Sequence, residues 1–327
     1  MQNSKEKPPF STERAEALCR TVTDEIEGAV IASEEFLESL LVGVLSKQHA
    51  LIQDVPGTGK TLTARSIADT VGLEFNRIQF TPDMLPADIT GSNVYDERNR
   101  DFEFAKGPIF SNIILAEDLN RAPPKTQSAL LEAMQQKEVS VGGETIQLPE
   151  PFFVLATQNP IEEEGTFPLP TSQLDRFTLK TEMGYPDRTG DREIIDRRLS
   201  RMVSTPTVDQ ILEPETVIQL QEMPEFVHVD EKIREYVVDI VRTTRGHNAV
   251  DVGVSPRGMQ RFLEAVRARA VIRGRDFVIP DDVKLLAGPT LSHRLVLDSA
   301  ALVEQTTREA VIQDVLDQIE VPAMNEL

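Results

Sequence analysis

Apolar residues follow two different spacings along the chain, and the change from one to the other divides the sequence into two regions. Between residue 49 and about residue 182, short apolar runs alternate with loops and helices, and these runs are HALIQ (49–53), EFNRIQF (74–80), NIILA (112–116), FFVLAT (152–157) and RFTLK (176–180). Near-continuous apolar strands of this kind are typical of a parallel sheet that helices cover on both faces. The first region is therefore predicted to be an α/β domain.

Outside that region the apolar positions have helical spacing. We expect helices in the acidic first 30 or so residues and over 34–45, and then, beyond GYPDR (184–188), over 231–245, 256–273 and 280–291 and from about residue 302 onwards. No strands are expected after GYPDR. The patterns thus predict a helical segment over residues 1–30, an α/β core over 31–200 and a small all-α domain over 201–327.

Two hairpins are expected within the α/β region. Residues 139–148, VSVGGETIQL, alternate around Gly142 and Gly143, which is a good signal for a two-residue turn. Residues 92–104, SNVYDERNRDFEF, predict a second hairpin with a charged tip. The first hairpin could either project towards a partner or pack on the body of the domain.

The composition narrows the classes of function. The net charge of −20 argues against sequence-independent binding to nucleic acid, which relies on lysines and arginines to neutralise phosphates, so protein partners are expected instead. There is no signal peptide and no apolar run of the roughly 18 residues needed to cross a bilayer. We therefore expect a cytoplasmic protein without membrane insertion. Cys19 is the only cysteine and excludes an internal disulfide, and the four histidines lack the spacing of a zinc site.

The stretch ALIQDVPGTGKTLTARSIADT (50–70) combines a strand, a Gly-rich turn and the start of a helix. Gly57 and Gly59 allow backbone N–H groups to curl around phosphate oxygens. Lys60 supplies positive charge for the β- and γ-phosphates, and the Thr61 hydroxyl can bind Mg²⁺. The predicted nucleotide-binding residues are Asp54, Val55, Pro56, Gly57, Thr58, Gly59, Lys60, Thr61 and Leu62. Asp54 replaces the first glycine of the GxxxxGK[ST] pattern, so its charge must point away from the triphosphate.

A second strand ends in two carboxylates. IILAEDLNR begins at Ile113 and places Glu117 and Asp118 directly after four apolar residues. A phosphate-binding loop needs acids at the end of a neighbouring strand to hold Mg²⁺ and to orient the attacking water. Glu117 and Asp118 together fit that need, beside the Thr61 hydroxyl.

Six motifs occur in an order and at a spacing that resemble the MoxR-type AAA+ ATPases. They are DVPGTGKT (54–61), LNRAPPKTQSALLEAMQ (119–135), PFFVLATQNPIEEEGTFPLP (151–170), QLDRF (173–177), GYP (184–186) and SPR (255–257). The resemblance covers about residues 26 to 295. It implies a P-loop AAA+ core with a C-terminal helical lid, ATP and Mg²⁺ as ligands, and a homo-hexameric ring that forms with nucleotide. It also implies chaperone-like work on protein clients, together with proteins that carry a von Willebrand factor A domain.

The resemblance also assigns roles to three polar residues. Asn159 in ATQNP corresponds to sensor 1, although Asn before Pro160 is also a common turn signal. Arg176 in QLDRF corresponds to the arginine finger that reaches a nucleotide bound by a neighbouring subunit, with an ordinary ion pair to Asp175 or to a surface acid as the alternative. Arg257 in SPR corresponds to sensor 2 at the start of a lid helix, where it can reach a triphosphate and couple the lid angle to the nucleotide.

The chain departs from the family pattern at the acidic pair. Relatives have Asp followed by Glu, whereas Glu117 precedes Asp118 here. The resemblance therefore implies Glu117 as the magnesium ligand beside Thr61, and Asp118 as the residue that orients the water. Asp118 is shorter than Glu by one C–C bond, roughly 1.5 Å, and a misplacement of about 1 Å can cost on the order of a hundredfold in rate. We therefore expect tight ATP binding and slow hydrolysis. Ala32 also replaces a glycine that relatives have near the adenine pocket.

Three functions remain open on the sequence. The favoured one is an ATP-driven machine that remodels protein partners. The alternatives are the ATPase subunit of a metal chelatase, and a nucleotide-gated scaffold with negligible turnover. Asn159, Arg176 and Arg257 argue against a small-molecule kinase, because they would have no coherent role in one.

Overall fold

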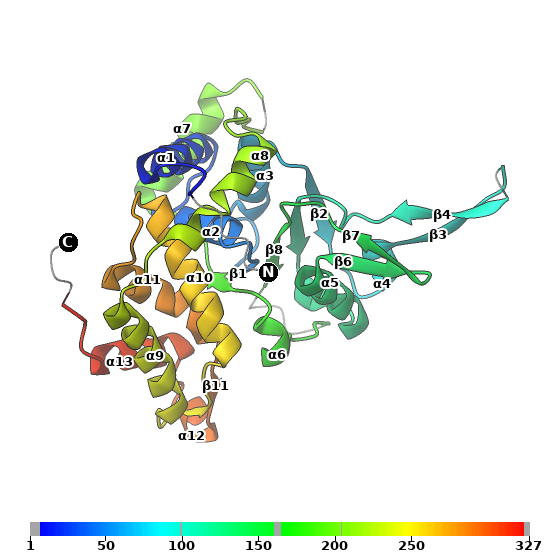
Figure 1. The fold of residues 1–327 in the computed structure, drawn as a ribbon. Helices are drawn as coiled ribbons and strands as arrows, with labels where there is room; N and C mark the ends of the chain where they lie inside the picture. Colours follow the sequence, from blue (N-terminus) through cyan, green and yellow to red (C-terminus); the bar gives the residue numbers. More distant parts are fainter. Residues whose placement is uncertain (1–6, 99, 160–164, 204, 324–327) are drawn as a thin grey trace.

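The computed structural model describes residues 7–98, 100–159, 165–203 and 205–323, and its centre is a sheet of five parallel strands (Figure 1). These strands are β1 (Ala50–Gln53), β2 (Phe75–Gln79), β5 (Ile113–Glu117), β8 (Phe153–Gln158) and β9 (Leu179–Thr181). Each predicted apolar run overlaps one of them, and all of the pairings are parallel. The predicted parallel sheet is therefore confirmed.

The strand order is β2-β5-β8-β1-β9, so the chain leaves β1 for the far edge of the sheet and later returns to the other side of β1. Such a reversal opens a crevice at the carboxyl ends of the strands, where α/β sheets bind their ligands. The loops after β1, β5 and β8 meet at this crevice. They carry the predicted phosphate-binding loop, the acidic pair and Asn159, respectively.

Helices cover both faces of the sheet and continue beyond it. The helices up to residue 200 are α1 (Thr12–Ala29), α2 (Glu34–Leu45), α3 (Lys60–Thr70), α4 (Pro86–Thr90), α5 (Pro124–Gln136), α6 (Thr171–Leu174) and α7 (Arg188–Ser200). The C-terminal ones are α8 (Pro214–Leu220), α9 (Glu231–Gly246), α10 (Pro256–Ile272), α11 (Pro280–Leu291), α12 (Ser299–Val303) and α13 (Arg308–Gln318). Within the described ranges, no helix combines the length and the apolar character needed to span a membrane.

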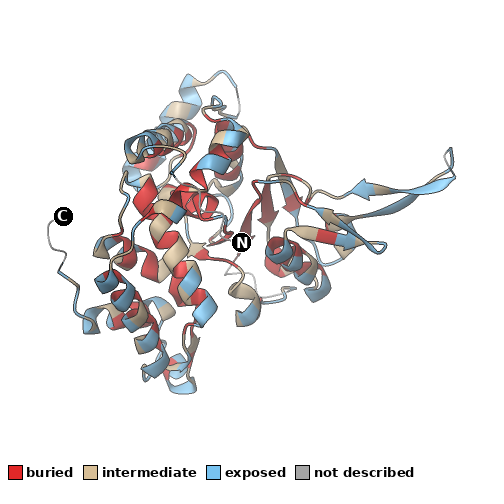
Figure 2. Cartoon of the chain, viewed as in Figure 1, coloured by how far each residue is buried: buried red, intermediate tan, exposed pale blue. Residues whose placement is uncertain are grey.

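Side chains along the strands alternate between two apolar cores, as the pleat of a strand requires. In β5, Ile113 and Leu115 belong to one core, which the apolar faces of α1, α2 and α3 also line. Ile114 and Ala116 belong to the other core, which α5 covers. Figure 2 shows this burial running through the sheet and into α10.

The C-terminal helices share the first core, because α10 packs against both α1 and α2. Ion pairs reinforce this contact. Arg273 donates two hydrogen bonds of 2.8 Å to the carboxylate of Glu38 in α2, and Arg269 lies 3.2 Å from the same group. The N-terminal helices therefore connect the helical lid to the sheet.

Both predicted hairpins are confirmed. β6 (Glu138–Val141) and β7 (Glu144–Gln147) turn at two glycines with positive φ, and Val139 is buried in the second core. β3 (Gly91–Asp96) and β4 (Asp101–Lys106) form the longer hairpin, which projects away from the body (Figure 1). Tyr95 and Phe102 stack edge to face on it and remain 51% and 65% exposed.

Two expectations about the C-terminal part are wrong. β10 (Val250–Val252) and β11 (Val296–Leu297) form a small antiparallel sheet, so strands do occur after GYPDR; both are too short to leave an alternating pattern. The single C-terminal helix is broken into α12 and α13. Gln305 has a left-handed φ of 58°, which ends α12, and the Thr307 hydroxyl caps α13.

Candidate functional site

The Gly-rich loop after β1 has the backbone conformation that a phosphate cradle requires. Gly57 and Gly59 have φ values of 87° and 110°, which side chains with a Cβ rarely adopt. α3 begins at Lys60, so its free N–H groups and the positive end of its dipole face the crevice. The Lys60 ammonium donates to the Val55 carbonyl and lies 3.3 Å from the Thr58 hydroxyl. Burial lowers the pKa of Lys60, which disfavours leaving this charge without an anionic partner.

Asp54 turns its carboxylate into its own loop. It is buried and accepts hydrogen bonds from the Val55 amide at 2.7 Å and from the Thr58 hydroxyl at 3.1 Å. The Gly184 amide, from the segment that follows β9, donates to it at 3.1 Å. Local donors therefore balance this negative charge, and the hydrogen bond from Gly184 ties the loop to the segment after β9.

Glu117 lies against the start of α3. One of its carboxylate oxygens accepts from the Thr61 hydroxyl, and the other is 2.7 Å from Nε and 2.5 Å from Nη2 of Arg77 in β2. β2 and β5 are neighbours with Arg77 two positions before the residue opposite Glu117, which explains this reach. A hydroxyl oxygen and a carboxylate oxygen side by side are hard ligands of the kind Mg²⁺ prefers, and phosphate and water supply the remainder in such sites.

Asp118 follows in an unusual conformation. Its φ of 56° is left-handed, and its amide donates to the Thr157 hydroxyl at 3.0 Å. Its carboxylate accepts from the Gln79 amide at 2.7 Å and lies 3.9 Å from Nε of Arg121. Arg77 and Gln79 are themselves joined by a 2.9 Å hydrogen bond. One polar network therefore holds both acids.

These residues line a single cavity of about 500 Å³ at the carboxyl ends of β1, β5 and β8. The sequence-predicted members are Asp54, Pro56, Gly57, Gly59, Lys60, Thr61, Leu62, Glu117, Asp118 and Asn159. Asn159 is buried at the end of β8, and Pro160, which follows it, lies outside the described residues. The glycine turn, the half-buried Lys60 and the oxygen pair of Thr61 and Glu117 fit a nucleoside triphosphate with its magnesium ion.

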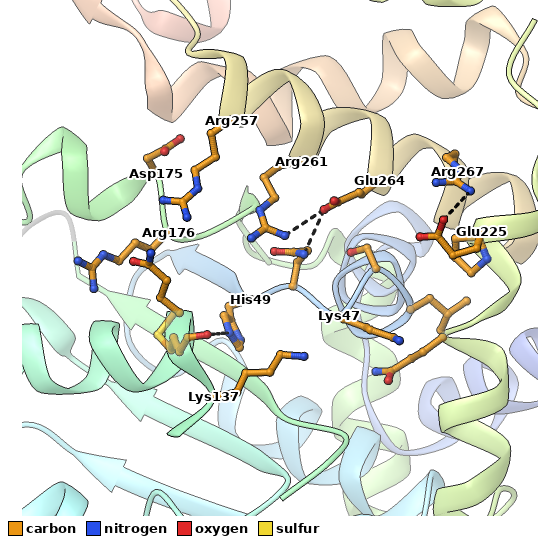
Figure 3. Close-up of a pocket in the computed structure, with 17 residues that line it drawn as sticks. Lys47, His49, Lys137, Asp175, Arg176, Glu225, Arg257, Arg261, Glu264 and Arg267 are labelled. Carbon is orange, nitrogen blue, oxygen red and sulfur yellow. Dashed lines mark hydrogen bonds and ion pairs between the residues drawn. The ribbon is translucent and has the colours of Figure 1, made fainter. Parts of the chain in front are cut away.

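Arg176 and Arg257 do not line this cavity. They line a separate pocket of about 270 Å³ between the start of α10 and the segment after α6, which we call the arginine pocket. Figure 3 shows Arg257 hanging from α10 towards Asp175 and Arg176. Arg257 therefore lies outside the nucleotide cavity of its own chain, on a helix that packs against α2.

The arginine pocket is rich in cations that differ in their pairing. Arg261 pairs with Glu264 at 3.0 Å, and Arg267 pairs with Glu225 at 3.2 Å. Among the described residues, by contrast, neither Arg176 nor Arg257 forms a side-chain hydrogen bond or an ion pair. The alternative interpretation, an ion pair between Arg176 and Asp175, is not observed between these two described residues. Asp175 pairs with Arg294 at 2.7 Å instead.

Three residues of the nucleotide cavity, Arg77, Gln79 and Thr157, are absent from the sequence-based set. Arg77 and Gln79 flank the buried Ile78 and so share one face of β2, beside the acidic strand end. The available signal was that β2 carries the polar residues Asn76, Arg77 and Gln79 within a short strand. Placing them required the knowledge that β2 neighbours β5, which the sequence pattern does not give.

Comparisons with known proteins agree with this geometry. The family model of the ATPase family associated with various cellular activities (AAA) matches residues 49–179, and that of the AAA lid domain matches residues 242–315. The chain is 44% identical over 299 residues to the uncharacterised protein YeaC of Bacillus subtilis, covering 91% of this chain and 93% of YeaC. A crystal structure of a proposed ATPase from Cytophaga hutchinsonii has a TM-score of 0.89 and 36% identity, covering 95% of this chain and 97% of that one.

The chain is also 42% identical over 332 residues to the chaperone MoxR1 of Mycobacterium tuberculosis, covering 98% of this chain and 87% of MoxR1. This alignment includes the phosphate-binding loop, the acidic strand end and the helical lid. The chain therefore belongs to the MoxR-type family of AAA+ ATPases.

Proposed function

We propose that the chain hydrolyses ATP within an assembly of identical copies and uses the energy to remodel protein partners. The observation that carries this proposal is the division of the candidate residues between two surfaces. The phosphate-binding loop and its acids line one cavity, whereas Arg176 and Arg257 line another and have no hydrogen-bond or ion-pair partner for their side chains among the described residues. A nucleotide bound in the cavity of one copy would supply the anion that the arginine pocket of the next copy lacks.

The residues of the nucleotide cavity have distinct roles in this proposal. Lys60 would exchange the Val55 carbonyl for the β- and γ-phosphates, and the glycine turn would bind the phosphate oxygens through its N–H groups. Thr61 and Glu117 would hold Mg²⁺, which neutralises charge on those oxygens. Asp118 and Asn159 would orient the attacking water.

Arg176 and Arg257 would complete the site from a neighbouring subunit. The reaction spreads negative charge over the γ-phosphoryl oxygens in the transition state, and a guanidinium delivered in trans stabilises that charge. Hydrolysis would then depend on assembly. The lack of side-chain partners within the described part of the chain supports this role, because a guanidinium that no carboxylate holds can form charge-assisted hydrogen bonds with a phosphate.

Mixing two inactive variants tests the arrangement. Lys60→Ala should abolish nucleotide binding but leave Arg176 intact. Arg176→Ala should still bind nucleotide but lacks the arginine finger. Each alone is expected to be nearly inactive. An equimolar mixture should recover about a quarter of the native ATPase rate, because half of the cavities are intact and half of their neighbours carry the finger.

A mixture as inactive as its components would contradict the trans assignment. Sizing by light scattering with ATP, with ADP and without nucleotide would then separate the causes. Growth in mass with ATP for Arg176→Ala, but not for Lys60→Ala, is the expected pattern. An unchanged mass in every condition would contradict the proposed assembly, and with it the homo-hexameric ring.

The partner is proposed from the relatives. MoxR1 carries the name of a chaperone, which supports protein clients for this chain. The family resemblance points further to a protein with a von Willebrand factor A domain. Co-purification from native cells tests this, since recovery of a large catalytic chelatase subunit in its place would favour the chelatase alternative.

A further inference from the structure

Arg294 is a buried arginine of the lid that contacts the α/β core beside Arg176. It ends the 3₁₀ turn Ser292–Arg294, which follows α11 directly, and only 4% of it is exposed. A charge this deeply buried is costly unless it is fully paired, so its partners indicate what it is for.

The guanidinium of Arg294 contacts the segment on both sides of Arg176. Its Nε donates to the Asp175 carboxylate at 2.7 Å. Its Nη2 donates to the Phe177 carbonyl at 2.9 Å, and its Nη1 donates to the Thr178 carbonyl at 3.1 Å. One planar group thus fixes the residue before Arg176 and the two residues after it.

The same segment is anchored from the core. Phe177 is fully buried, and its carbonyl lies 3.0 Å from Nε2 of His293. The Thr178 hydroxyl donates to Gln48 at 3.1 Å, and the Thr178 amide donates to the His49 carbonyl at 2.9 Å. The backbone on both sides of Arg176 is therefore held by hydrogen bonds, whereas the Arg176 guanidinium has no partner among the residues that the structure describes.

Arg294 also touches the helix that carries Arg257. A Cβ added at Gly258, the next residue, would lie 2.8 Å from Cδ of Arg294, so the arginine stem packs directly on the first turn of α10. Arg294 is therefore wedged between the segment of Arg176 and the segment of Arg257. The segments that carry Arg176 and Arg257 are far apart in sequence, but both contact Arg294.

We propose that Arg294 is a positioning residue that sets Arg176 and Arg257 at a fixed spacing, so that both meet one triphosphate held by a neighbouring copy. This inference rests on the proposed function, because it concerns how the arginine pocket is prepared for a nucleotide bound by a neighbouring copy. Arginine suits the task because its rigid fork of donors can bind a carboxylate and several carbonyls at once, which lysine cannot. A misplacement of about 1 Å at a reacting group can cost on the order of a hundredfold in rate.

The test uses the asymmetry of trans catalysis. The reference is the mixture of Lys60→Ala, which donates only the finger, with Arg176→Ala, which offers only the nucleotide cavity. Arg294→Gln is then added to one chain at a time. In the finger donor it should lower the recovered ATPase rate by about 10- to 100-fold. In the nucleotide acceptor it should leave that rate within about twofold of the reference.

The outcomes separate cleanly. An equal loss in either chain would mean that Arg294 only stabilises the fold, and a donor rate equal to the reference would mean that it positions nothing; either result overturns the inference. If the reference mixture itself recovers no activity, the trans assignment fails and this inference fails with it. Thermal unfolding and nucleotide affinity, measured on each single variant, show whether Arg294→Gln folds.

Gly258→Ala provides a second probe that does not depend on deleting a charge. Alanine favours a helix interior over glycine, yet its Cβ would press on the buried stem of Arg294. We expect a several-fold loss of recovered rate, again only when the change is in the finger donor. Arg269→Gln is the matched control, because Arg269 is an equally buried lid arginine that pairs with Asp282 and Glu38 instead. It should lower the melting temperature but leave the recovered rate within about twofold of the reference in either chain.

Discussion

The nucleotide cavity and the arginine pocket differ in how the chain balances their charges. In the cavity, Lys60, Glu117 and Asp118 each have a partner from the same chain. In the arginine pocket, Arg176 and Arg257 have none among the described residues, although Arg261 beside them does. Paired charges can be kept in an isolated subunit, whereas free guanidinium groups are complementary to an anion from outside. The charges of the first surface are thus balanced within the chain, whereas the second surface fits the proposed role as one half of an interface between copies.

The most severe test of this difference is to remove an arginine that has no partner among the described residues. Arg176→Ala should lower the steady-state ATPase rate by about 10³-fold or more, because a guanidinium finger contributes that much to phosphoryl transfer. The dissociation constant for ATP should stay within about threefold, since Arg176 lies outside the nucleotide cavity. Turnover by phosphate release and affinity by fluorescent nucleotide titration measure the two effects separately.

Arg261→Ala is the matched control for that experiment. Arg261 lines the same pocket but already pairs with Glu264, so its loss should cost less than tenfold in rate. Equal losses for the two variants would show that pairing does not distinguish the arginines. The contrast between the two surfaces would then have no functional meaning.

Much of the fold follows from the sequence because burial leaves a local pattern. Strands buried on both faces must be apolar throughout, and so the run around Ile113 and those like it mark the sheet without an alignment. Helices with one buried face are equally legible, and 34–45 and 280–291 match α2 and α11. The two-residue β11 fails this test because it is too short to show a period, and the break at Gln305 fails it because one backbone angle sets it.

The candidate site divides in the same way. Gly57, Lys60 and Thr61 are legible because a phosphate cradle imposes residue types on consecutive positions. Arg77 is not, because its role arises from the pairing of β2 with β5. The separation of Arg257 from the nucleotide cavity depends on packing between α10 and α2, which no local pattern encodes.

The floor of the arginine pocket offers a pH test of how firmly that surface is built. His49 is buried there, with Nε2 3.1 Å from the Met134 carbonyl and Nδ1 accepting from the Val154 amide at 3.0 Å. Burial lowers its pKa to about 4. The unfolded chain therefore binds more protons than the native one between about pH 6.5 and pH 4, and stability must fall as the pH falls through that window.

The size of this effect is about 3 kcal/mol at pH 4, from the difference between the two pKa values. Urea unfolding at pH 7 and at pH 4 measures it. His49→Asn keeps polar atoms at the site but cannot titrate, so its free energy of unfolding should fall by about 3 kcal/mol less than that of the native chain over the same interval. If the free energy of unfolding of the two chains changes equally with pH, protonation of His49 does not destabilise the fold as predicted.

The acidic pair tests whether the nucleotide cavity, though complete, is also well arranged for catalysis. Restoring the family order with Glu117→Asp and Asp118→Glu together should raise the ATPase rate by about a hundredfold, because the water-orienting carboxylate regains its reach. Nucleotide affinity should hardly change. Glu117→Asp alone is the control, and it should not raise the rate. Equal turnover in the native and the doubly substituted chains would contradict the slow-hydrolysis hypothesis.

The smallest expected effect concerns stability and explains why the reversed order suits this backbone. Asp118 has φ 56° and ψ 47°, the left-handed region that Asp and Asn enter more readily than other side chains. Asp118→Glu should therefore lower the free energy of unfolding by about 1 kcal/mol or less, and Asp118→Asn should leave it nearly unchanged. Chemical unfolding of both variants measures this difference. If Asp118→Glu proves as stable as the native chain, the backbone does not favour aspartate here. If Asp118→Glu is less stable but hydrolyses ATP faster, aspartate at this position stabilises the turn beside Thr157 and also slows the reaction. The contacts of Asp118 within the chain would then favour folding over hydrolysis.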